Sequence, residues 1–156
     1  MDITSLDRLR KTEDVVCRPD GIIIAIKDSW IIEGEDRLSY TTLIRLIECC
    51  REHHWQIDIL PVAKGKPLDS ICKLLTCDFI RPIAVGSTVF IKYQITEVRR
   101  RSYTLRFKVL ETANNSLCAE CDLVSVFYDP IARQCKPPPS SLIDKLTELC
   151  CPRREK

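Results

Sequence analysis

The second half of the chain alternates apolar and polar residues with a period of two, and this pattern constrains the fold more than any other feature. Residues 88–98 and 102–109 are the two clearest runs, and the link between them is short and polar. Side chains two apart point to the same face of a strand, so each run predicts a strand with one buried face. A third strand is predicted over residues 117–128, after a turn at Asn114 and Asn115. Three consecutive strands with short links predict an antiparallel meander. The alternating residues are Val89, Ile91, Tyr93 and Ile95, then Tyr103, Leu105, Phe107 and Val109.

A single long amphipathic helix is predicted ahead of the meander, over residues 40–55. Its apolar residues recur at spacings of three and four, which is the period of a helix with one buried face. Ser39 is a suitable N-cap, and strands are predicted before and after the helix, at residues 22–32 and 70–80. Because a lone amphipathic helix must bury its apolar stripe, the sheet is its expected partner and the fold class is α+β. The stripe consists of Tyr40, Leu43, Leu46, Ile47, Cys50 and His54.

The remaining segments predict shorter elements. Residues 1–20 have apolar positions at helical spacing and predict a short lead-in helix that Gly21 ends. A loop containing proline and glycine is expected at residues 61–67. Three prolines at 137–139 force an extended segment before a predicted, capped helix over residues 140–151.

Composition narrows the classes of function. The 156 residues suffice for one domain with a sizeable core. Lys and Arg number 24 against 22 Asp and Glu, so the net charge of +2 supplies little drive for binding nucleic acid. The longest apolar run, residues 22–26, is too short to span a bilayer, and the first residues lack the pattern of a secretion signal. We expect a cytoplasmic protein with neither a nucleic-acid nor a membrane partner.

Ten cysteines require an explanation. Most fall in the predicted helix or strands, where a reduced cysteine packs as a small apolar side chain. Cys118 and Cys121 form a CxxC motif, but residues three apart in a strand point to opposite faces and no second CxxC completes a zinc site. Motifs for serine hydrolases, nucleotide phosphates and zinc proteases are absent from the sequence. The sequence therefore predicts neither a metal site nor a cofactor.

Three segments of the chain resemble a known family. Residues 79–86 followed by Val89-Phe90-Ile91, residues 101–107, and Ala119-Glu120 to Val126 with Asp129 after it are similar to the strands of acyl-CoA thioesterases of the 4-hydroxybenzoyl-CoA thioesterase type. The resemblance covers residues 21–146 and implies the hot-dog fold, in which a curved five-stranded antiparallel sheet wraps one long helix. The domain organisation that follows is a lead-in segment at 1–20, a hot-dog domain at 21–130 and a C-terminal extension at 131–156.

The resemblance implies hydrolysis of an acyl-CoA or acyl-carrier-protein thioester to a free acid and a thiol. It also implies a homodimer or homotetramer, which the bare sheet edge of a single chain favours independently. One carboxylate and a helix N-terminus suffice for this chemistry, because a thiolate departs readily. Family members often carry an Asp and then Gly-His-Val-Asn before the helix, where this chain has residues 33–39 instead. The candidate acids are Asp36 just before the helix, Glu48 within it, and Glu33 at the place of the usual loop acid.

Two of the candidate acids also have a structural interpretation: Asp36 as one of three acids favoured by the positive helix end, and Glu48 as an ion-pair partner of Arg51 or Arg45. The substrate-binding candidates are Tyr40 at the helix start, Arg81 at a strand end, and Arg100, Arg101 and Ser102 in the hairpin. The guanidinium groups of the arginines suit the phosphates of coenzyme A. A solvated turn is the alternative for the hairpin. Two other functions stay open, a non-catalytic acyl-CoA sensor and a hot-dog dehydratase or hydratase that would use His53 or His54. A Cys49–His53 nucleophile is a further alternative.

Overall fold

The computed structural model describes residues 15–31 and 33–151. Its contacts divide the chain into two compact units. The first unit holds the described residues up to His54 together with Asp78–Tyr93 and Phe107–Glu120, and the second holds Trp55–Cys77, Gln94–Arg106 and the chain from Cys121 onward. Three strands of the meander therefore contribute residues to both units.

The strands form one sheet in the order β1-β2-β4-β5-β6-β3, and a short strand β7 pairs with β6. The three strands of the predicted meander are confirmed, as is the strand that precedes them, because β3 matches residues 70–80. The predicted number of five strands is wrong, since β1 and β7 were not foreseen. The bounds are β1 Val15–Arg18, β2 Gly21–Ala25, β3 Asp69–Phe79, β4 Thr88–Val98, β5 Ser102–Glu111, β6 Ser116–Asp129 and β7 Gln134–Cys135.

Strand β1 lies inside the range predicted as a lead-in helix. Residues 1–14 of that prediction lie outside the described residues, but residues 15–18 pair antiparallel with β2, from Val15 opposite Ile24 to Arg18 opposite Gly21. Pairing overrides the weak helical spacing here because Ile22 and Ile24 offer a fully buried partner strand. The first predicted strand was also too long, because β2 ends at Ala25 and a 3₁₀ helix, η1 (Asp28–Trp30), follows it.

The period of two in the meander matches the burial of its side chains. In β5 the alternate residues Tyr103, Leu105, Phe107 and Val109 are buried, and the residues between them are partly exposed. Burying one such apolar side chain contributes roughly 1.5–3 kcal/mol. The alternation thus reports a sheet with one face in the core, as predicted.

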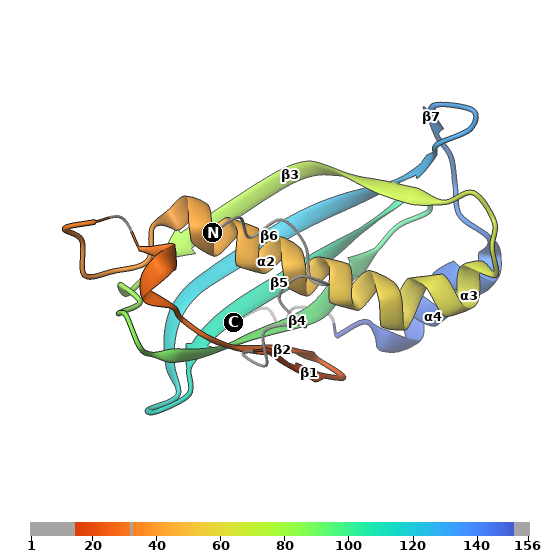
Figure 1. Cartoon of the computed structure of the whole chain (residues 1–156). Helices are drawn as coiled ribbons and strands as arrows, with labels where there is room; N and C mark the ends of the chain where they lie inside the picture. The colour runs from red at the N-terminus through yellow and green to blue at the C-terminus, as the bar shows by residue number, and fades with distance from the viewer. Residues whose placement is uncertain (1–14, 32, 152–156) are drawn as a thin grey trace. The chain divides into compact units, whose positions relative to one another are not determined.

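In the first unit, helix α2 (Tyr40–His54) packs on β2 and on the first half of β4 (Figure 1). The thiol of Cys50 donates a hydrogen bond to the carbonyl of Ile91 at 3.3 Å, and the ring centroids of His54 and Tyr93 are 4.8 Å apart. Gly21 is required beside them, since a Cβ there would lie 2.1 Å from the oxygen of Ile91. The buried face of the helix is Leu43, Leu46, Ile47, Cys49, Cys50, His53 and His54.

In the second unit the helical path continues beyond the predicted end of the long helix. A π-helical segment η2 (Trp55–Ile59) leads into α3 (Leu60–Ala63), where a loop was expected. Pro61 does not prevent this, because it occupies the first turn of α3, where a backbone N–H has no helical acceptor. Lys64, in the left-handed conformation with φ 50°, ends the helix.

Helix α4 (Ser140–Leu149) confirms the predicted C-terminal helix, although it ends two residues early. It buries Leu142 and Leu146 and contacts α3. The predicted side-chain cap is absent, because the residue at the cap position is Pro139, whose carbonyl accepts the N–H of Leu142 at 3.0 Å. None of the helices in residues 15–31 and 33–151 is long and apolar enough to cross a bilayer.

Candidate functional site

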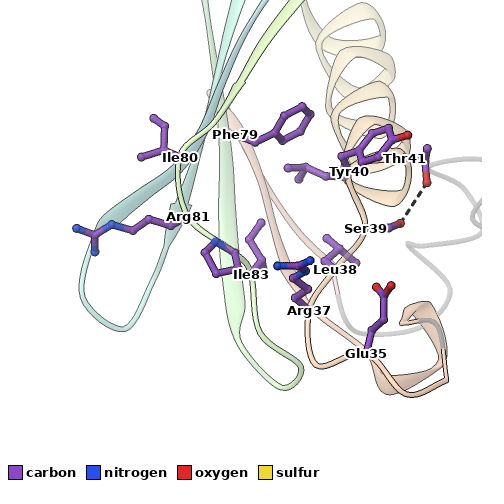
Figure 2. Close-up of a pocket in the computed structure, with 12 residues that line it drawn as sticks. Glu35, Arg37, Leu38, Ser39, Tyr40, Thr41, Phe79, Ile80, Arg81 and Ile83 are labelled. Carbon is purple, nitrogen blue, oxygen red and sulfur yellow. Dashed lines mark hydrogen bonds between the residues drawn. The ribbon is translucent and has the colours of Figure 1, made fainter.

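The first unit contains a cavity of about 590 Å³ beside the N-terminus of α2 (Figure 2). One wall comes from the loop before the helix and from its first turn, and the other from the end of β3 and the four residues after it. Its size and mixture of apolar and polar groups are typical of a small-molecule site. The lining residues are Glu35, Arg37, Leu38, Ser39, Tyr40, Thr41, Leu43, Phe79, Ile80, Arg81, Pro82 and Ile83.

Backbone hydrogen bonds hold the two walls together. The N–H of Leu38 donates to the carbonyl of Ile83 at 2.8 Å, and Arg37 forms an isolated antiparallel bridge with Ala84. The N–H of Val85 donates to the carbonyl of Asp36 at 3.4 Å. The loop therefore runs as a short extended strand against residues 83–85, and this path decides which of its side chains reach the cavity.

Ser39 is the N-cap of α2, as the sequence predicted. Its Oγ accepts the N–H of Thr42 at 3.3 Å, and its carbonyl accepts the N–H of Leu43 at 3.0 Å. The N–H groups of Tyr40 and Thr41 belong to the first turn, where a helix supplies no acceptor of its own. Together with the positive end of the helix dipole, these two donors suit a developing negative charge.

Two aromatic rings face each other across the cavity. The ring centroids of Tyr40 and Phe79 are 6.0 Å apart with the planes tilted by 60°, and Figure 2 shows both rings directed toward the space between the walls. Tyr40 is 65% exposed and Phe79 is 50% exposed. Such exposure of paired aromatic residues favours contact with an apolar ligand group.

Charged side chains line the cavity on the side of the loop and after β3. Arg81, a predicted substrate-binding residue, lines the cavity. Its Nη1 donates to Ser116 Oγ at 3.4 Å, and its side chain points away from Tyr40 in Figure 2. Glu35 lines the cavity as well, and its carboxylate is directed toward the side where Ser39 and Thr41 lie. The sequence analysis missed Glu35, and the only available signal was its position four residues before the N-cap.

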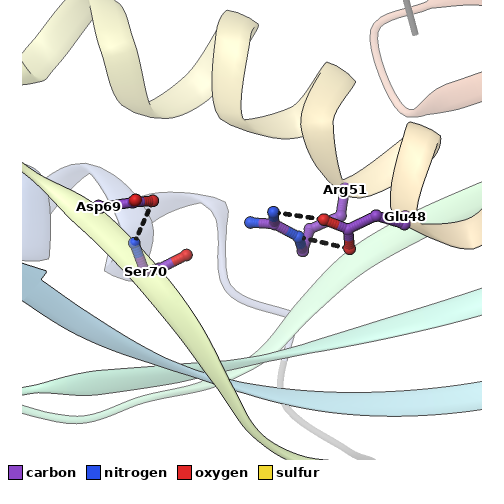
Figure 3. A network of polar contacts seen from close by, with 4 residues as sticks. All are labelled: Glu48, Arg51, Asp69 and Ser70. Carbon is purple, nitrogen blue, oxygen red and sulfur yellow. Dashed lines mark hydrogen bonds and ion pairs between the residues drawn. The ribbon is translucent and has the colours of Figure 1, made fainter. Parts of the chain in front are cut away.

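Two of the predicted catalytic acids, Asp36 and Glu33, are exposed loop residues that do not line this cavity. The third, Glu48, lies on α2, and its side chain is 56% exposed. Its carboxylate forms a bidentate ion pair with the guanidinium of Arg51, shown in Figure 3. Nε of Arg51 donates to one carboxylate oxygen at 2.8 Å, and Nη2 donates to the other at 2.6 Å. The alternative interpretation of Glu48 as the ion-pair partner of Arg51 is confirmed.

The histidines and the cysteine that were considered as catalytic groups are buried in the last turns of α2. His53 Nε2 lies 2.6 Å from the carbonyl oxygen of Arg18, and His54 packs on Tyr93. Burial, followed by the nearby carboxylates of Glu52 and Glu48, raises the pKa of Cys49 to about 12. A thiol with so high a pKa is a poor nucleophile, and none of these three residues lines the cavity.

The other predicted binding residues, Arg100, Arg101 and Ser102, belong to the second unit, in the tight hairpin between β4 and β5. The N–H of Arg99 donates to the carbonyl of Ser102 at 2.8 Å, and the carbonyl of Arg101 accepts the N–H of Phe127 at 3.0 Å. The hairpin backbone is therefore well supported, while the side chains of Arg100 and Arg101 are exposed.

The CxxC cysteines lie in β6, as predicted, and both are buried. Burial, reinforced by the charge of Glu111, raises the pKa of Cys118. All ten cysteines carry free thiols. Among the residues that the structure describes, no group of three or more His, Cys, Asp or Glu side chains is placed to hold a metal ion.

Comparison with known proteins bears on the fold and the family. Residues 73–118 match the sequence model of the thioesterase superfamily, which confirms the predicted resemblance. No curated protein matches the chain in sequence.

Solved structures resemble the chain over most of its length. One is a predicted thioesterase from Bacillus stearothermophilus, with 18% identity and a TM-score of 0.73, covering 86% of this chain and 98% of that chain. A second is a 1,4-dihydroxy-2-naphthoyl-CoA thioesterase from Synechocystis, with 11% identity, a TM-score of 0.69 and coverage of 83% and 96%. A third is a Staphylococcus aureus protein in complex with CoA, with 7% identity, a TM-score of 0.71 and coverage of 86% and 87%. At these identities the likeness shows the fold, and the predicted hot-dog architecture is confirmed.

Proposed function

We propose that this chain, which has the hot-dog fold and matches the thioesterase superfamily over residues 73–118, hydrolyses acyl thioesters of coenzyme A or of an acyl carrier protein. The observation that carries the proposal is the cavity of about 590 Å³, which combines a helix N-terminus, an acid and apolar walls in one unit. The CoA bound to the Staphylococcus aureus neighbour and the CoA thioester named for the Synechocystis neighbour support coenzyme A as the carrier.

In this proposal the acyl group rests against Tyr40 and Phe79, and its thioester carbonyl points to the start of α2. The N–H groups of Tyr40 and Thr41 donate to the carbonyl oxygen as negative charge develops on it. A carboxylate takes a proton from a water molecule, whose oxygen attacks the carbonyl carbon. The carbon–sulfur bond then breaks, the thiolate leaves and is protonated, and the free acid remains.

Glu35 is our first choice for that carboxylate, because it lines the cavity. Asp36 and Glu33 belong to the same loop and remain alternatives, and Glu48 is the least favourable because Arg51 already engages both of its oxygens. Glu35→Gln, Asp36→Asn, Glu33→Gln and Glu48→Gln are the variants to compare. Asp144→Asn, which changes an exposed acid on α4, is the matched control.

Turnover should be followed by the loss of thioester ultraviolet absorbance with a panel of acyl-CoA substrates, because the ten thiols of the protein would react with a thiol reagent. We expect Glu35→Gln to lower kcat/KM by about 100-fold or more, which is the usual contribution of a general base, while Asp144→Asn keeps the wild-type value. Loss of activity in Asp36→Asn with full activity in Glu35→Gln would reassign the base. Absence of turnover with every substrate would refute hydrolysis.

A second candidate function is acyl-CoA binding without hydrolysis. The observation that favours it is the commitment of the helical acid Glu48 to Arg51, together with the exposure of the loop acids. A non-hydrolysable acyl-CoA thioether distinguishes the two functions. Stabilisation of the protein in a thermal-shift assay, without turnover of the matching thioester, would identify a sensor.

We also propose that two copies of the chain associate through β3. This strand is the last in the sheet order, so one of its edges has no partner strand within the described residues. Ile71, Leu74 and Phe79 on β3 are large, exposed apolar residues. An open apolar edge favours pairing with another chain, and a homodimer is the smallest assembly that covers it.

A further inference from the structure

The cavity beside α2 contains a charged group that the proposed hydrolysis does not use, the guanidinium of Arg37. Arg37 lies in the loop before the helix and is exposed. Figure 2 shows its guanidinium between the side chains of Leu38 and Ile83, which also line the cavity. A few polar groups on an otherwise apolar wall are what orient a ligand and select it. Arg37 is therefore a candidate for choosing among substrates.

Within residues 15–31 and 33–151, the guanidinium of Arg37 has no carboxylate partner. Other arginines of the described chain are neutralised by the protein itself. Arg51 binds Glu48 at 2.6 Å, and Arg106 binds Asp122 at 2.9 Å. The planar fork of N–H donors on Arg37 is left for a ligand, and its geometry matches the two oxygens of a carboxylate.

The two other charged side chains that line the cavity do not take this place. Arg81 donates to Ser116 Oγ at 3.4 Å. The carboxylate of Glu35 is directed toward the start of α2 in Figure 2, and in the part of the chain that the structure describes it forms no ion pair with Arg37. The proposed base and the cation can therefore act on different groups of one ligand.

The backbone on both sides of Arg37 is fixed, and its neighbours are apolar. Arg37 forms the isolated bridge with Ala84, and the N–H of Leu38 donates to the carbonyl of Ile83 at 2.8 Å. A fixed backbone reduces the entropy that ordering the site on binding would cost. Leu38 and Ile83 are both buried, and apolar neighbours strengthen the attraction between a guanidinium and a carboxylate relative to water.

We propose that Arg37 selects acyl thioesters whose acyl group carries a carboxylate of its own, as the monothioesters of dicarboxylic acids do. The apolar part of such an acyl group contacts Tyr40 and Phe79, and its carboxylate accepts hydrogen bonds from the guanidinium of Arg37. The thioester carbonyl stays at the start of α2. This inference rests on the proposed hydrolysis and names the class of substrate for the same cavity.

Two acyl-CoAs of equal chain length measure the selectivity, adipyl-CoA with a terminal carboxylate and hexanoyl-CoA without one. We expect a higher kcat/KM for adipyl-CoA in the wild type. Arg37→Gln should lower the ratio of the two kcat/KM values about tenfold, the size of one lost charged hydrogen bond. Arg37→Lys keeps the positive charge and should retain part of the preference. Arg133→Gln removes an exposed guanidinium between β6 and β7 and is the control, with the wild-type ratio expected.

A second pair replaces the chain by a ring, with 4-carboxybenzoyl-CoA and 4-methylbenzoyl-CoA as its members. A preference for the carboxylated member of either pair, reduced in Arg37→Gln, supports the proposal. The ratio also guards against a trivial loss of folding, because misfolded protein lowers the rates of both members of a pair equally. If Arg37→Gln lowered both rates by the same factor, or if the wild type preferred neither carboxylated member, the proposal would be overturned.

Binding of the corresponding thioethers, measured by titration calorimetry, separates this proposal from hydrolysis. Tighter binding of the carboxylated thioether, lost in Arg37→Gln, would support the selectivity even if no thioester were hydrolysed. Turnover without a preference at Arg37 would leave the hydrolysis proposal standing and refute the selectivity. Equal affinity for the two thioethers of each pair, or no binding of any of them, would also refute it. Because the contact is between charges, a higher salt concentration should reduce the preference.

Discussion

At the scale of single residues, the clearest electrostatic effect lies in the turn between β6 and β7. One carboxylate oxygen of Asp129 accepts the N–H groups of Ile131 and Ala132, both at 2.9 Å, and the other binds Lys136 Nζ at 3.2 Å. These contacts, with the N–H of Ala132 foremost, hold the pKa of Asp129 below its usual value. The ionised side chain therefore closes this turn.

Asp129 predicts a pH dependence of stability. Because its pKa is lower in the folded than in the unfolded chain, its contribution is complete above the ordinary aspartate pKa and is lost as pH falls through the lowered value. Asp129→Asn keeps an oxygen for the two N–H groups but loses the charge. We expect the variant to lack this part of the acid sensitivity, seen as a smaller change in urea midpoint between neutral and acid pH. An identical pH profile in wild type and variant would contradict this role.

At the scale of elements, the N-terminus of α2 joins folding to the candidate site. Ser39 caps the helix and lines the cavity. It directly follows the extended loop that hydrogen-bonds to residues 83–85. The N–H groups of Tyr40 and Thr41 have no acceptor within the helix, and both residues line the cavity where the proposed chemistry needs donors. The stability of the helix and the geometry of the site therefore depend on one hydroxyl.

Removing that hydroxyl should destabilise the protein measurably. We expect Ser39→Ala to lower the free energy of unfolding by about 1 kcal/mol, the usual cost of losing a side-chain cap. Ser39→Asp is the control, since aspartate caps as well as serine and is favoured by the positive helix end. Urea unfolding followed by circular dichroism measures both. If alanine and aspartate gave the same stability as serine, the cap would have no energetic role.

At the scale of the whole molecule, the sheet has two ends with different properties. The end at β1 is a four-residue strand, whereas the end at β3 is an eleven-residue strand with large apolar side chains exposed. Long apolar edges of this kind are rare in proteins that remain single chains. The proposed dimer accounts for the β3 edge.

A charged residue on that edge should weaken association. We expect the wild-type chain to have the mass of two copies by light scattering and Ile71→Lys to shift it toward a single copy, because lysine on an edge strand disfavours pairing. Ile131→Lys places the same charge at an exposed position outside β3 and should leave the mass unchanged. A single-chain mass for the wild type would refute the dimer.

The sequence by itself determined the elements whose periodicity spans many residues. The alternation from Val89 to Val109 and the stripe from Leu43 to Cys50 repeat often enough that burial on one face is their only stable outcome. Short elements gave no such signal. Strand β7 has two residues, β1 has four, and the continuation of the helix past Pro61 depends on which position of a helical turn the proline occupies.

The candidate site was determined only in part. Residue type and position pointed to the acid-rich loop and the helix start, because helix caps have local signatures, and the resemblance to thioesterases added Arg81 as a candidate. Which acid lines the cavity was decided by tertiary structure. The hydrogen bonds that join Asp36 and Leu38 to Val85 and Ile83 set the path of the loop, and Glu35 lines the cavity as a result. Those partners lie more than forty residues away along the chain, so only the folded molecule brings them together.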